Sequence, residues 1–493
     1  MPMSDRMTTS ASSKHVILTL DAFESLANIV QTVCEAVKHS SNPVLPLGRV
    51  DEWDATQARP WEARTVLFDD DAGRFKCWYA GTDASTKRWW ATGYAESEDG
   101  VHWVKPRIGL FEYNGSKDNN IVRGAWGPII KDDGEPDAQR RYKMIVKGPG
   151  SPDSVERLPN RVAYSPDGIH WTDGPHLALP AWNGRNPDPV ALIKDDQDPD
   201  PRRRYKLVWQ DTQKANKPGP ERVRVKCMAF GENVEHWTAS SDNPFLAPND
   251  GLEFENHFLM MAPYAGCWVL PYEYGWYTPN GQGTHGQYAA DIRLAVSRDG
   301  EHFDRLNPHQ KLIRRGSRGA WDSQFLVISD KPVIRGDKIY LYYCGQGEDW
   351  TGWPSPPPKF AFGSTGSIRL SRMGLATLRR DGWFCLETTD RELSGTATTR
   401  PIDANDPDVN LAANVSHTQS ARSWVEVEVL DAQTNEVIDG FSRDDCVKLE
   451  RDSVSQPVLW RNKKLADVGV ARIKLRFGLI GAARLYAFSF ERT

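Results

Sequence analysis

A long internal repeat is the feature that most constrains what this chain of 493 residues can fold into. A polar or aromatic cluster followed by a short apolar run occurs at residues 59–68, 123–130, 186–193, 254–261 and 319–328. If Glu62, Trp126, Asp188, Glu255 and Asp322 are equivalent positions, the successive spacings are 64, 62, 67 and 67 residues. A near-constant spacing of this length predicts one supersecondary unit per copy.

Two further signatures keep step with the first. Strand-like segments rich in aromatic and β-branched residues occur at 74–79, 141–146, 204–209, 267–272 and 338–343. Hairpins related to Ser-x-Asp-Gly-x-x-Trp follow at 97–103, 165–171, 231–237 and 297–303, with a remnant at 381–383. Glycine accepts a positive φ without steric cost, so Asp-Gly between strands indicates a tight turn. The three signatures together predict a five-bladed β-propeller, and their common period disfavours a β-sandwich with coincidental spacing.

The strand and hairpin signatures predict a mainly β protein. Because the repeat occupies only part of the chain, we expect three parts. Residues 1–44 form a tail and a short helix, because apolar residues follow a 3.6-residue period over residues 16–38. Residues 45–391 form the catalytic propeller. Residues 392–493 form a C-terminal β-sandwich, since apolar and charged residues alternate again there.

Charge and cysteine usage limit the partners and the compartment. A formal net charge of −5 gives no electrostatic reason to expect nucleic acid or an acidic membrane surface. The seven cysteines are scattered and form no Cys-x-x-Cys pair, which favours buried free thiols in a reducing, cytoplasmic setting. The first 15 residues lack the apolar core of a secretory signal. No cofactor is expected, and the N-terminal helix could pair two copies in a homo-oligomer.

The candidate site follows from the predicted propeller, in which the first strands of all blades line one axis. This geometry would gather four carboxylates, those of Glu62, Asp188, Glu255 and Asp322. Carboxylates that converge repel one another, an environment that suits general acid and base catalysis of glycosidic bond cleavage. The 19 tryptophans suggest sugar stacking as well. The expected substrate-binding residues are Arg64, His257, Gln324, Trp126, Trp321, Arg185, Trp53 and Tyr274, the last two at the rim.

A metal site is the alternative use of these side chains. His257 and His285 could join Glu255 and Asp322 in a mixed nitrogen and oxygen ligand set. No spacing such as His-Glu-x-x-His supports this set. We therefore expect no catalytic metal.

The five-fold pattern, the Ser-x-Asp-Gly-x-x-Trp hairpins and the sandwich that follows resemble the superfamily of glycoside hydrolase families 32, 43 and 68, over residues 45–493. The resemblance implies acidic catalytic residues on blades one, two and three. Residues 185–189 are similar to the Arg-Asp-Pro element of family 32, but lie on blade three. Blade two offers Trp126, and blade one lacks the Asn-Asp-Pro-Asn signature, so the chain looks like a divergent member with its own substrate.

The sequence thus predicts a glycoside hydrolase acting on an oligo- or polysaccharide, with a furanoside favoured. Glu255 is the expected general acid and Asp188 the base or nucleophile, while Glu62 and Asp322 orient sugar hydroxyls. Two alternatives stay open: a non-catalytic glycan-binding propeller, and a phosphorylase that would use Arg59, Arg64 and Arg185 to hold phosphate. The sugar, the linkage and the stereochemical course are not determined by the sequence.

Overall fold

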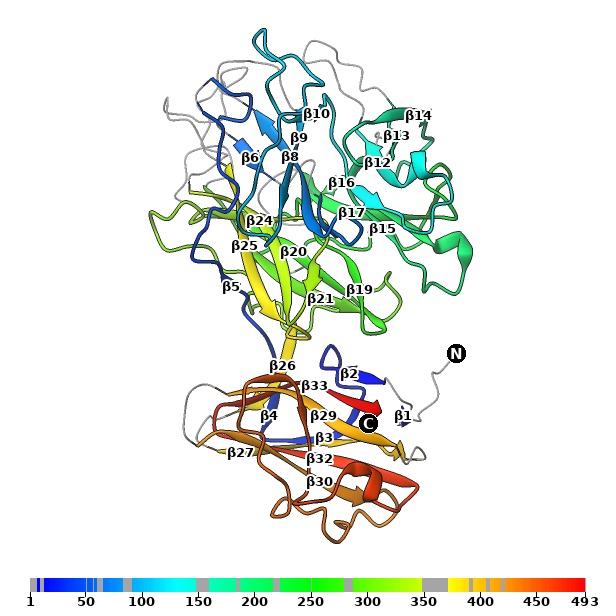
Figure 1. Cartoon of the computed structure of the whole chain (residues 1–493), viewed down its shortest axis with the longest axis vertical. Coiled ribbons are helices and arrows are strands. Elements are labelled where there is room, and N and C mark those ends of the chain that lie inside the picture. Colours follow the sequence, from blue (N-terminus) through cyan, green and yellow to red (C-terminus); the bar gives the residue numbers. More distant parts are fainter. Residues whose placement is uncertain are drawn as a thin grey trace. The chain divides into compact units, whose positions relative to one another are not determined.

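The protein is mainly β in a computed structural model. The structure describes residues 7–8, 13–49, 51–55, 57–59, 65–82, 91–147, 159–182, 187–215, 222–249, 251–278, 287–347, 371–389, 393–404, 408–417 and 422–492. Its helices, within that part of the chain, are three short 3-10 turns, Ala138–Arg140, Pro201–Arg203 and Leu465–Asp467. The chain divides into two compact units: Met1–Cys34, Ile334–Ile339 and Leu378–Thr493 form one, and Glu35–Val333 and Tyr340–Thr377 form the other (Figure 1).

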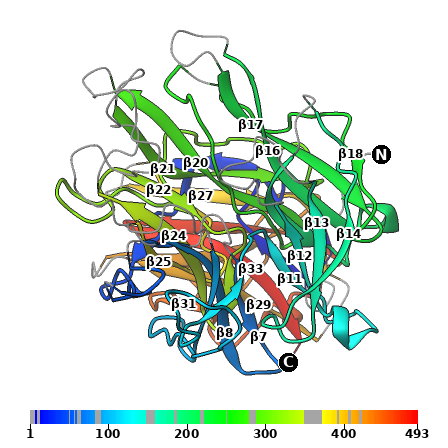
Figure 2. The same ribbon diagram turned by 90° about the horizontal axis from the view of Figure 1, so that it is seen from above.

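The strands of the larger unit fall into five groups along the chain, and Figure 2 labels strands from each of them. The first is β6 (Gln57–Arg59), β7 (Thr65–Asp69), β8 (Arg74–Thr82), β9 (Ala91–Ser97) and β10 (Ile121–Arg123). The second is β11 (Ile129–Lys131), β12 (Tyr142–Val146), β13 (Arg161–Ser165) and β14 (Thr172–His176). The third is β15 (Asp188–Lys194), β16 (Tyr205–Lys214), β17 (Arg222–Gly231) and β18 (Thr238–Ala239).

The last two groups complete this unit. The fourth is β19 (Ala262–Tyr264), β20 (Cys267–Thr278) and β21 (Gln287–Ser297). The fifth is β22 (Phe325–Ile328), β24 (Lys338–Gln346), β25 (Ser371–Arg379) and β5 (Val37–Lys38), with β23 (Val333–Arg335) beside β24. Parallel pairing of β6 with β25 and of β21 with β22 joins the first, fourth and fifth groups into one sheet.

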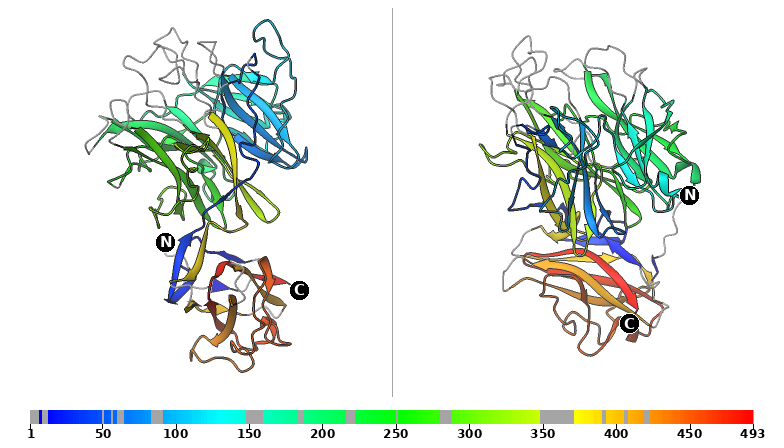
Figure 3. Two further views of the ribbon diagram at one scale, coloured as in Figure 1. Left: turned by 90° about the vertical axis from the view of Figure 1, so that its left-hand side faces the viewer. Right: turned by 45° about the horizontal axis from the view of Figure 1, so that its top comes forward.

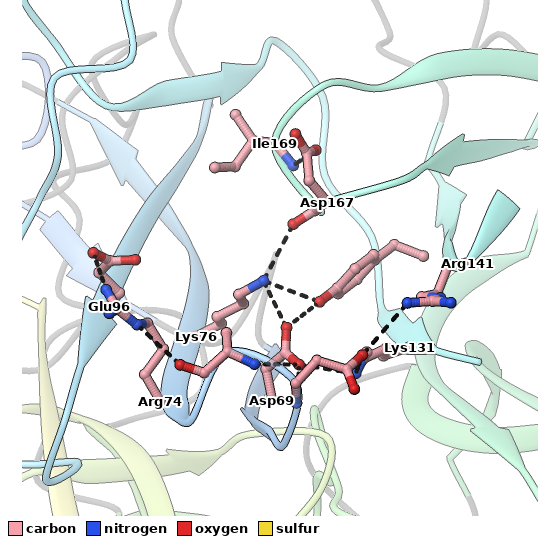
Figure 4. A network of polar contacts seen from close by, with 12 residues as sticks. Asp69, Arg74, Lys76, Glu96, Lys131, Arg141, Asp167 and Ile169 are labelled. Carbon is pink, nitrogen blue, oxygen red and sulfur yellow. Dashed lines mark hydrogen bonds and ion pairs between the residues drawn. The ribbon is translucent and has the colours of Figure 1, made fainter. Parts of the chain in front are cut away.

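A repeated aspartate links neighbouring groups. Asp69, at the end of β7, is paired with Lys76 at 2.7 Å and with Lys131 of the second group at 2.8 Å (Figure 4). The Tyr142 hydroxyl of the second group donates to the same carboxylate at 2.6 Å. Burial opposes the charge, but the hydrogen bonds from Lys131, Lys76 and Tyr142 outweigh it and hold the pKa of Asp69 well below its ordinary value.

Asp132 repeats this arrangement 63 residues later, after β11. It is paired with Lys143 at 2.8 Å and with Lys194 of the third group at 2.7 Å. Tyr205 of the third group donates to it at 2.6 Å. The same residue types therefore join the first group to the second and the second to the third.

The Asp-Gly hairpins have the conformation that the sequence predicts. Gly100, Gly168 and Gly300 have φ values of 78°, 81° and 74°. In the first hairpin, Oδ1 of Asp99 accepts hydrogen bonds from two following backbone N–H groups, at 2.8 Å each. Asp167 and Asp299 make equivalent bonds. The hairpin signature therefore marks a real turn in each of these three copies.

The smaller unit contains two six-stranded sheets. One is β1 (Met7–Thr8), β28 (Ile402–Asp403), β32 (Arg472–Ile480), β27 (Ser394–Thr399), β3 (Phe23–Ala27) and β30 (Trp424–Asp431). The other is β31 (Ser453–Pro457), β29 (Val409–His417), β33 (Ala483–Arg492), β26 (Phe384–Thr388), β4 (Ile29–Val33) and β2 (Lys14–Val16). Phe477 of the first sheet contacts Phe488 of the second, with ring centroids 5.2 Å apart.

The predicted N-terminal helix over residues 16–38 is wrong. The segment forms strands β3, β4 and β5, and the first two pair with β27 and β26 of the smaller unit, where Figure 3 shows blue strands among yellow-to-red ones. Ile29, Gln31 and Val33 are buried while Val30 is 40% exposed, so β4 follows a two-residue period. Asn28, with φ of 55°, separates β3 from β4. The apolar residues of this segment fit a helical and a strand period alike. Pairing with β26 and β27 is what makes the segment form strands.

The structure also describes the cysteine thiols and the length of the helices. None of the seven cysteines, all of which lie in the described ranges, forms a disulfide bond, and those at 77, 227, 344, 385 and 446 are buried. Within the described ranges, no helix has the length and apolar character needed to cross a membrane. The cytoplasmic location inferred from the cysteines stays a prediction.

Candidate functional site

Polar side chains gather where β17 of the third group faces the segment before β19. Glu255, only 2% exposed, lies in this segment. Nη1 of Arg224 is 3.1 Å from Oε1 of Glu255, and the backbone N–H of Arg224 donates to Oε2 at 3.2 Å. The Tyr277 hydroxyl donates to Oε1 at 3.4 Å. Burial opposes the charge of Arg224, but Glu255 outweighs it and raises the pKa of Arg224.

Lys226 binds the next residue of the same segment. Its side chain is fully buried, and Nζ donates to the backbone oxygen of Asn256 and, at 3.1 Å, to its Oδ1. Arg224 and Lys226 are two residues apart on β17, so both side chains leave the same face of the sheet. That face therefore holds residues 255 and 256 by two cations.

The side chain of Asp188, in β15 of the third group, projects from this same face. It pairs with Gln210 of β16, which in turn pairs with Lys226 of β17. Directly paired residues of antiparallel strands point to one face, and two strand spacings put the Cα atoms of Asp188 and Lys226 about 10 Å apart. Asp188 is 30% exposed, and Nζ of Lys147 lies 2.8 Å from its Oδ2. Lys147 also lies 5.8 Å from the ring centroid of Trp126.

His257 and Gln324 meet through Tyr288. Nδ1 of His257 lies 2.8 Å from Oε1 of Glu273 and 2.9 Å from the Tyr288 hydroxyl, which donates to Glu273. Gln324 donates from Nε2 to the backbone oxygen of Tyr288 at 2.5 Å. Burial, followed by the charge of Glu273, raises the pKa of Tyr288 well above its ordinary value. Tyr288 and Tyr277 have ring centroids 5.2 Å apart, so this cluster adjoins Glu255.

The residues that the sequence singled out lie in two sets: Asp188 and Trp126 lie beside Lys147, and Glu255, His257 and Gln324 lie beside Tyr277 and Tyr288. Arg224 and Lys226 hold residues 255 and 256 against the sheet face from which Asp188 projects. The sequence reasoning missed Arg224, Lys226 and Tyr288. A signal for the first two was present, because Arg222, Arg224 and Lys226 alternate with valines in 222–226. Charged residues on one face of such a strand indicate polar partners there.

Asp322 belongs to a different cluster. Its Oδ2 lies 2.5 Å from Nζ of Lys38 and accepts from the Tyr343 hydroxyl at 2.9 Å. Trp321 stacks on Tyr343 with ring centroids 5.8 Å apart. Asn42 donates to the same hydroxyl at 3.2 Å.

The first group contains a second copy of this cluster. Asp54 accepts from Lys105 at 2.5 Å and from the Tyr79 hydroxyl at 2.7 Å. Trp53 stacks on Tyr79 at 5.6 Å, and Asn120 donates to Tyr79 at 2.7 Å. Asp54, rather than Glu62, is therefore the counterpart of Asp322, and the alignment that placed Glu62 there is corrected.

Two predicted rim residues are buried. Trp53 is 2% exposed in its cluster, and its Nε1 donates to Oδ1 of Asn120 at 2.8 Å. Tyr274 is 3% exposed, with the Arg293 guanidinium 4.6 Å from its ring centroid. Both rings are almost fully buried, so the predicted exposed rim is wrong for both, although Trp53 lines the cavity beside its own cluster.

Several predicted residues lie outside the described part of the chain. They are Glu62, Arg64, Arg185, His285 and the side chain of Arg59. In the ranges that are described, no group of three or more His, Cys, Asp or Glu side chains is arranged to hold a metal ion.

Comparisons with known proteins give matches in structure alone. No protein-family model matches the sequence, and no curated protein matches it. A glycosyl hydrolase from Bacteroides ovatus is 17% identical at a TM-score of 0.44, over 74% of this chain and 96% of that one. An N-acetylgalactosamine deacetylase from F. plautii, in complex with blood group B trisaccharide, is 14% identical at a TM-score of 0.46, over 72% and 96%.

A third structure accompanies the finding that the GH130 family of mannoside phosphorylases contains glycoside hydrolases that target beta-1,2 mannosidic linkages in Candida mannan. It is 16% identical at a TM-score of 0.44, over 74% of this chain and 96% of that one. Scores at this level assign the chain to no family.

Proposed function

We propose that the chain is a glycoside hydrolase whose chemistry lies between the third and fourth groups of the larger unit. In this proposal the five antiparallel groups form a five-bladed β-propeller and the two sheets of the smaller unit form a β-sandwich. The observation that carries it is a pair of carboxylates at one sheet face: Asp188 projects from this face, and Arg224 of the same face holds Glu255. Two carboxylates on either side of a glycosidic bond are the usual equipment for its hydrolysis.

The contacts of the two carboxylates indicate which catalytic role each one has in this proposal. Both oxygens of Glu255 accept hydrogen bonds or ion pairs, from Arg224 and Tyr277. An environment made of donors suits a carboxylate that acts as nucleophile or base, rather than the general acid expected from the sequence. Asp188, which is more exposed, takes the complementary role. His257 and Gln324 are near enough to the pair, through Tyr288, to line the sugar site.

Asp322 is proposed to be structural. Its cluster with Lys38, Tyr343 and Trp321 is repeated around Asp54, and a catalytic carboxylate would not need a duplicate of its whole surroundings. Packing in the cluster leaves no room for a side chain at residue 345, because a Cβ on Gly345 would lie 2.4 Å from Cβ of Asp322. The cluster thus packs the chain tightly before the first strand of its group.

The experiment that tests the proposal is a screen of aryl furanosides, aryl pyranosides and short oligosaccharides, with and without inorganic phosphate. We expect hydrolysis of at least one class at the same rate in both conditions, with a furanoside favoured. NMR of the first-formed anomer then decides between retention and inversion. Formation of a sugar phosphate only in the presence of phosphate would show a phosphorylase, and binding without turnover would show a glycan-binding protein.

Asp188→Asn is expected to lower kcat by a factor of about 10² or more, because the amide cannot act as acid or base. Circular dichroism and the melting temperature should stay close to those of the wild type, since Asp188 is part-exposed and Lys147 keeps an acceptor. An Asp188→Asn enzyme with wild-type kcat on the best substrate of the screen would exclude this residue from the chemistry.

A further inference from the structure

A cavity lies beside the Trp53–Asp54 cluster, and neither Asp188 nor Glu255 lines it. It has a volume of about 500 Å³, within the range usual for small-molecule sites. Its lining includes Asp54, Lys105, Arg107, Tyr113, Asp118 and Asn120. Asp54 and Asn120 are 1% and 4% exposed, so the cavity reaches buried polar groups of the cluster.

Comparison of the two clusters shows where this cavity comes from. In the copy around Asp322, Lys38 and Asn42 supply the amine and the amide, and only residues 39–41 lie between them. In the copy around Asp54 the same groups come from Lys105 and Asn120. Residues 106–119 therefore have no counterpart of similar length between the corresponding residues of the other cluster.

The added segment is an ordered loop. Tyr113 and Ser116 form a bridge across a turn in which Asn114 and Gly115 have φ values of 49° and 77°. Asn119 closes it by donating to the backbone oxygen of Phe111 at 2.8 Å. An ordered insertion that walls a polar cavity, at one of two otherwise equivalent places, is typical of a binding site.

The charges in the cavity fit a neutral ligand. Arg107 lies 3.0 Å from Asp118, Lys105 lies 2.5 Å from Asp54, and Arg49 lies 3.3 Å from Glu52. Each of these three cations has an anion beside it. A charged ligand that binds one member of a pair would therefore be repelled by the other member. Paired donors and acceptors instead match hydroxyl groups, which both donate and accept.

We propose that this cavity is a second saccharide-binding site, which holds a neutral sugar unit without cleaving it. The choice of a saccharide over other neutral, hydroxyl-rich ligands rests on the proposed function. The catalytic pair is not involved, because Asp188 and Glu255 are absent from the lining.

The test uses the full chain carrying Glu255→Gln, so that oligosaccharides survive the measurement. Isothermal titration calorimetry and saturation-transfer NMR are run with arabinose, galactose, mannose and their di- and trisaccharides. One variant replaces residues 106–119 by the three residues 39–41 of the other cluster. A second carries Arg107→Ala with Asp118→Ala; these side chains are 81% and 51% exposed, so we expect the variant to fold as the parent does.

We expect both variants to lose one binding event, with affinity for that site at least tenfold weaker, while hydrolysis of aryl glycosides by the same variants without Glu255→Gln stays within twofold. Equal binding in parent and variants, or no saccharide bound by the parent, would overturn the proposal. Failure of the proposed function looks different: saccharide binding would depend on the loop, but no substrate of the screen would be cleaved.

Discussion

Glu255→Gln is expected to abolish nearly all turnover, with kcat lower by a factor of about 10² to 10⁴. The amide oxygen can still accept from Arg224 and Tyr277, so the buried contacts of residue 255 are largely kept. The amide nitrogen cannot act as nucleophile or base. The measurement is kcat on the best substrate of the screen, normalised to folded protein.

The matched control for this variant is Asp322→Asn. Asp322 is 3% exposed and, like Glu255, contacts one cation and one tyrosine hydroxyl. A general loss of structure from neutralising a buried carboxylate would affect both variants. We expect Asp322→Asn to lower the melting temperature while kcat per folded molecule stays within a few-fold. If Asp322→Asn loses as much turnover as Glu255→Gln, the structural assignment of Asp322 is wrong.

The strand pattern was predictable because it depends on local chemistry that recurs. The Asp-Gly turns at 99–100, 167–168 and 299–300 require glycine, and the strands between them are rich in aromatic residues. The N-terminal segment was not predictable in this way. Its apolar residues satisfy helical and strand periods alike, and β4 forms because β26, more than 350 residues later, offers an edge. Such pairing is a tertiary effect that a local pattern cannot contain.

The candidate site was predictable only in part, for a related reason. Glu255 and Asp188 were found because each precedes an apolar run. Asp322 was aligned with Glu62 by spacing alone, although Trp-Asp occurs at 53–54 and 321–322, in both cases with a glycine six residues before the aspartate. The chain also has Tyr-x-Gly at 79–81 and 343–345. Matching these pairs would have placed Asp54 opposite Asp322 and indicated a packing role for both.

The largest expected effect on stability comes from Asp132→Ala. Asp132 is 2% exposed and neutralises Lys143, whose side chain is 3% exposed. Removing one partner of a buried ion pair leaves a buried charge and costs about 3 to 5 kcal/mol. Glu135 stays 2.9 Å from Lys143, so we expect the lower end of that range, about 3 kcal/mol. Urea unfolding at pH 7 measures it.

Two comparisons show whether this loss comes from the buried pair. Asp133→Ala removes the adjacent carboxylate, which is 74% exposed and contacts Lys131, and should change the free energy of unfolding by less than about 0.5 kcal/mol. The double variant Asp132→Ala with Lys143→Met removes both charges and should regain part of the loss. Equal effects of Asp132→Ala and Asp133→Ala would contradict a special role for Asp132.

The pH dependence of the same pair has a defined sign. Burial opposes the charge of Asp132, but hydrogen bonds from Lys143, Lys194 and Tyr205 outweigh it and lower its pKa from 3.8 to about 2. A carboxylate whose pKa is lower in the folded state stabilises the fold fully above its unfolded pKa and loses this effect as the pH falls through the folded value. The advantage of the wild type over Asp132→Ala should therefore be constant from about pH 7 to 5 and shrink between about pH 4 and 2. An advantage that does not change down to pH 2 would mean that the carboxylate charge contributes nothing, and that Asp132 acts through packing alone.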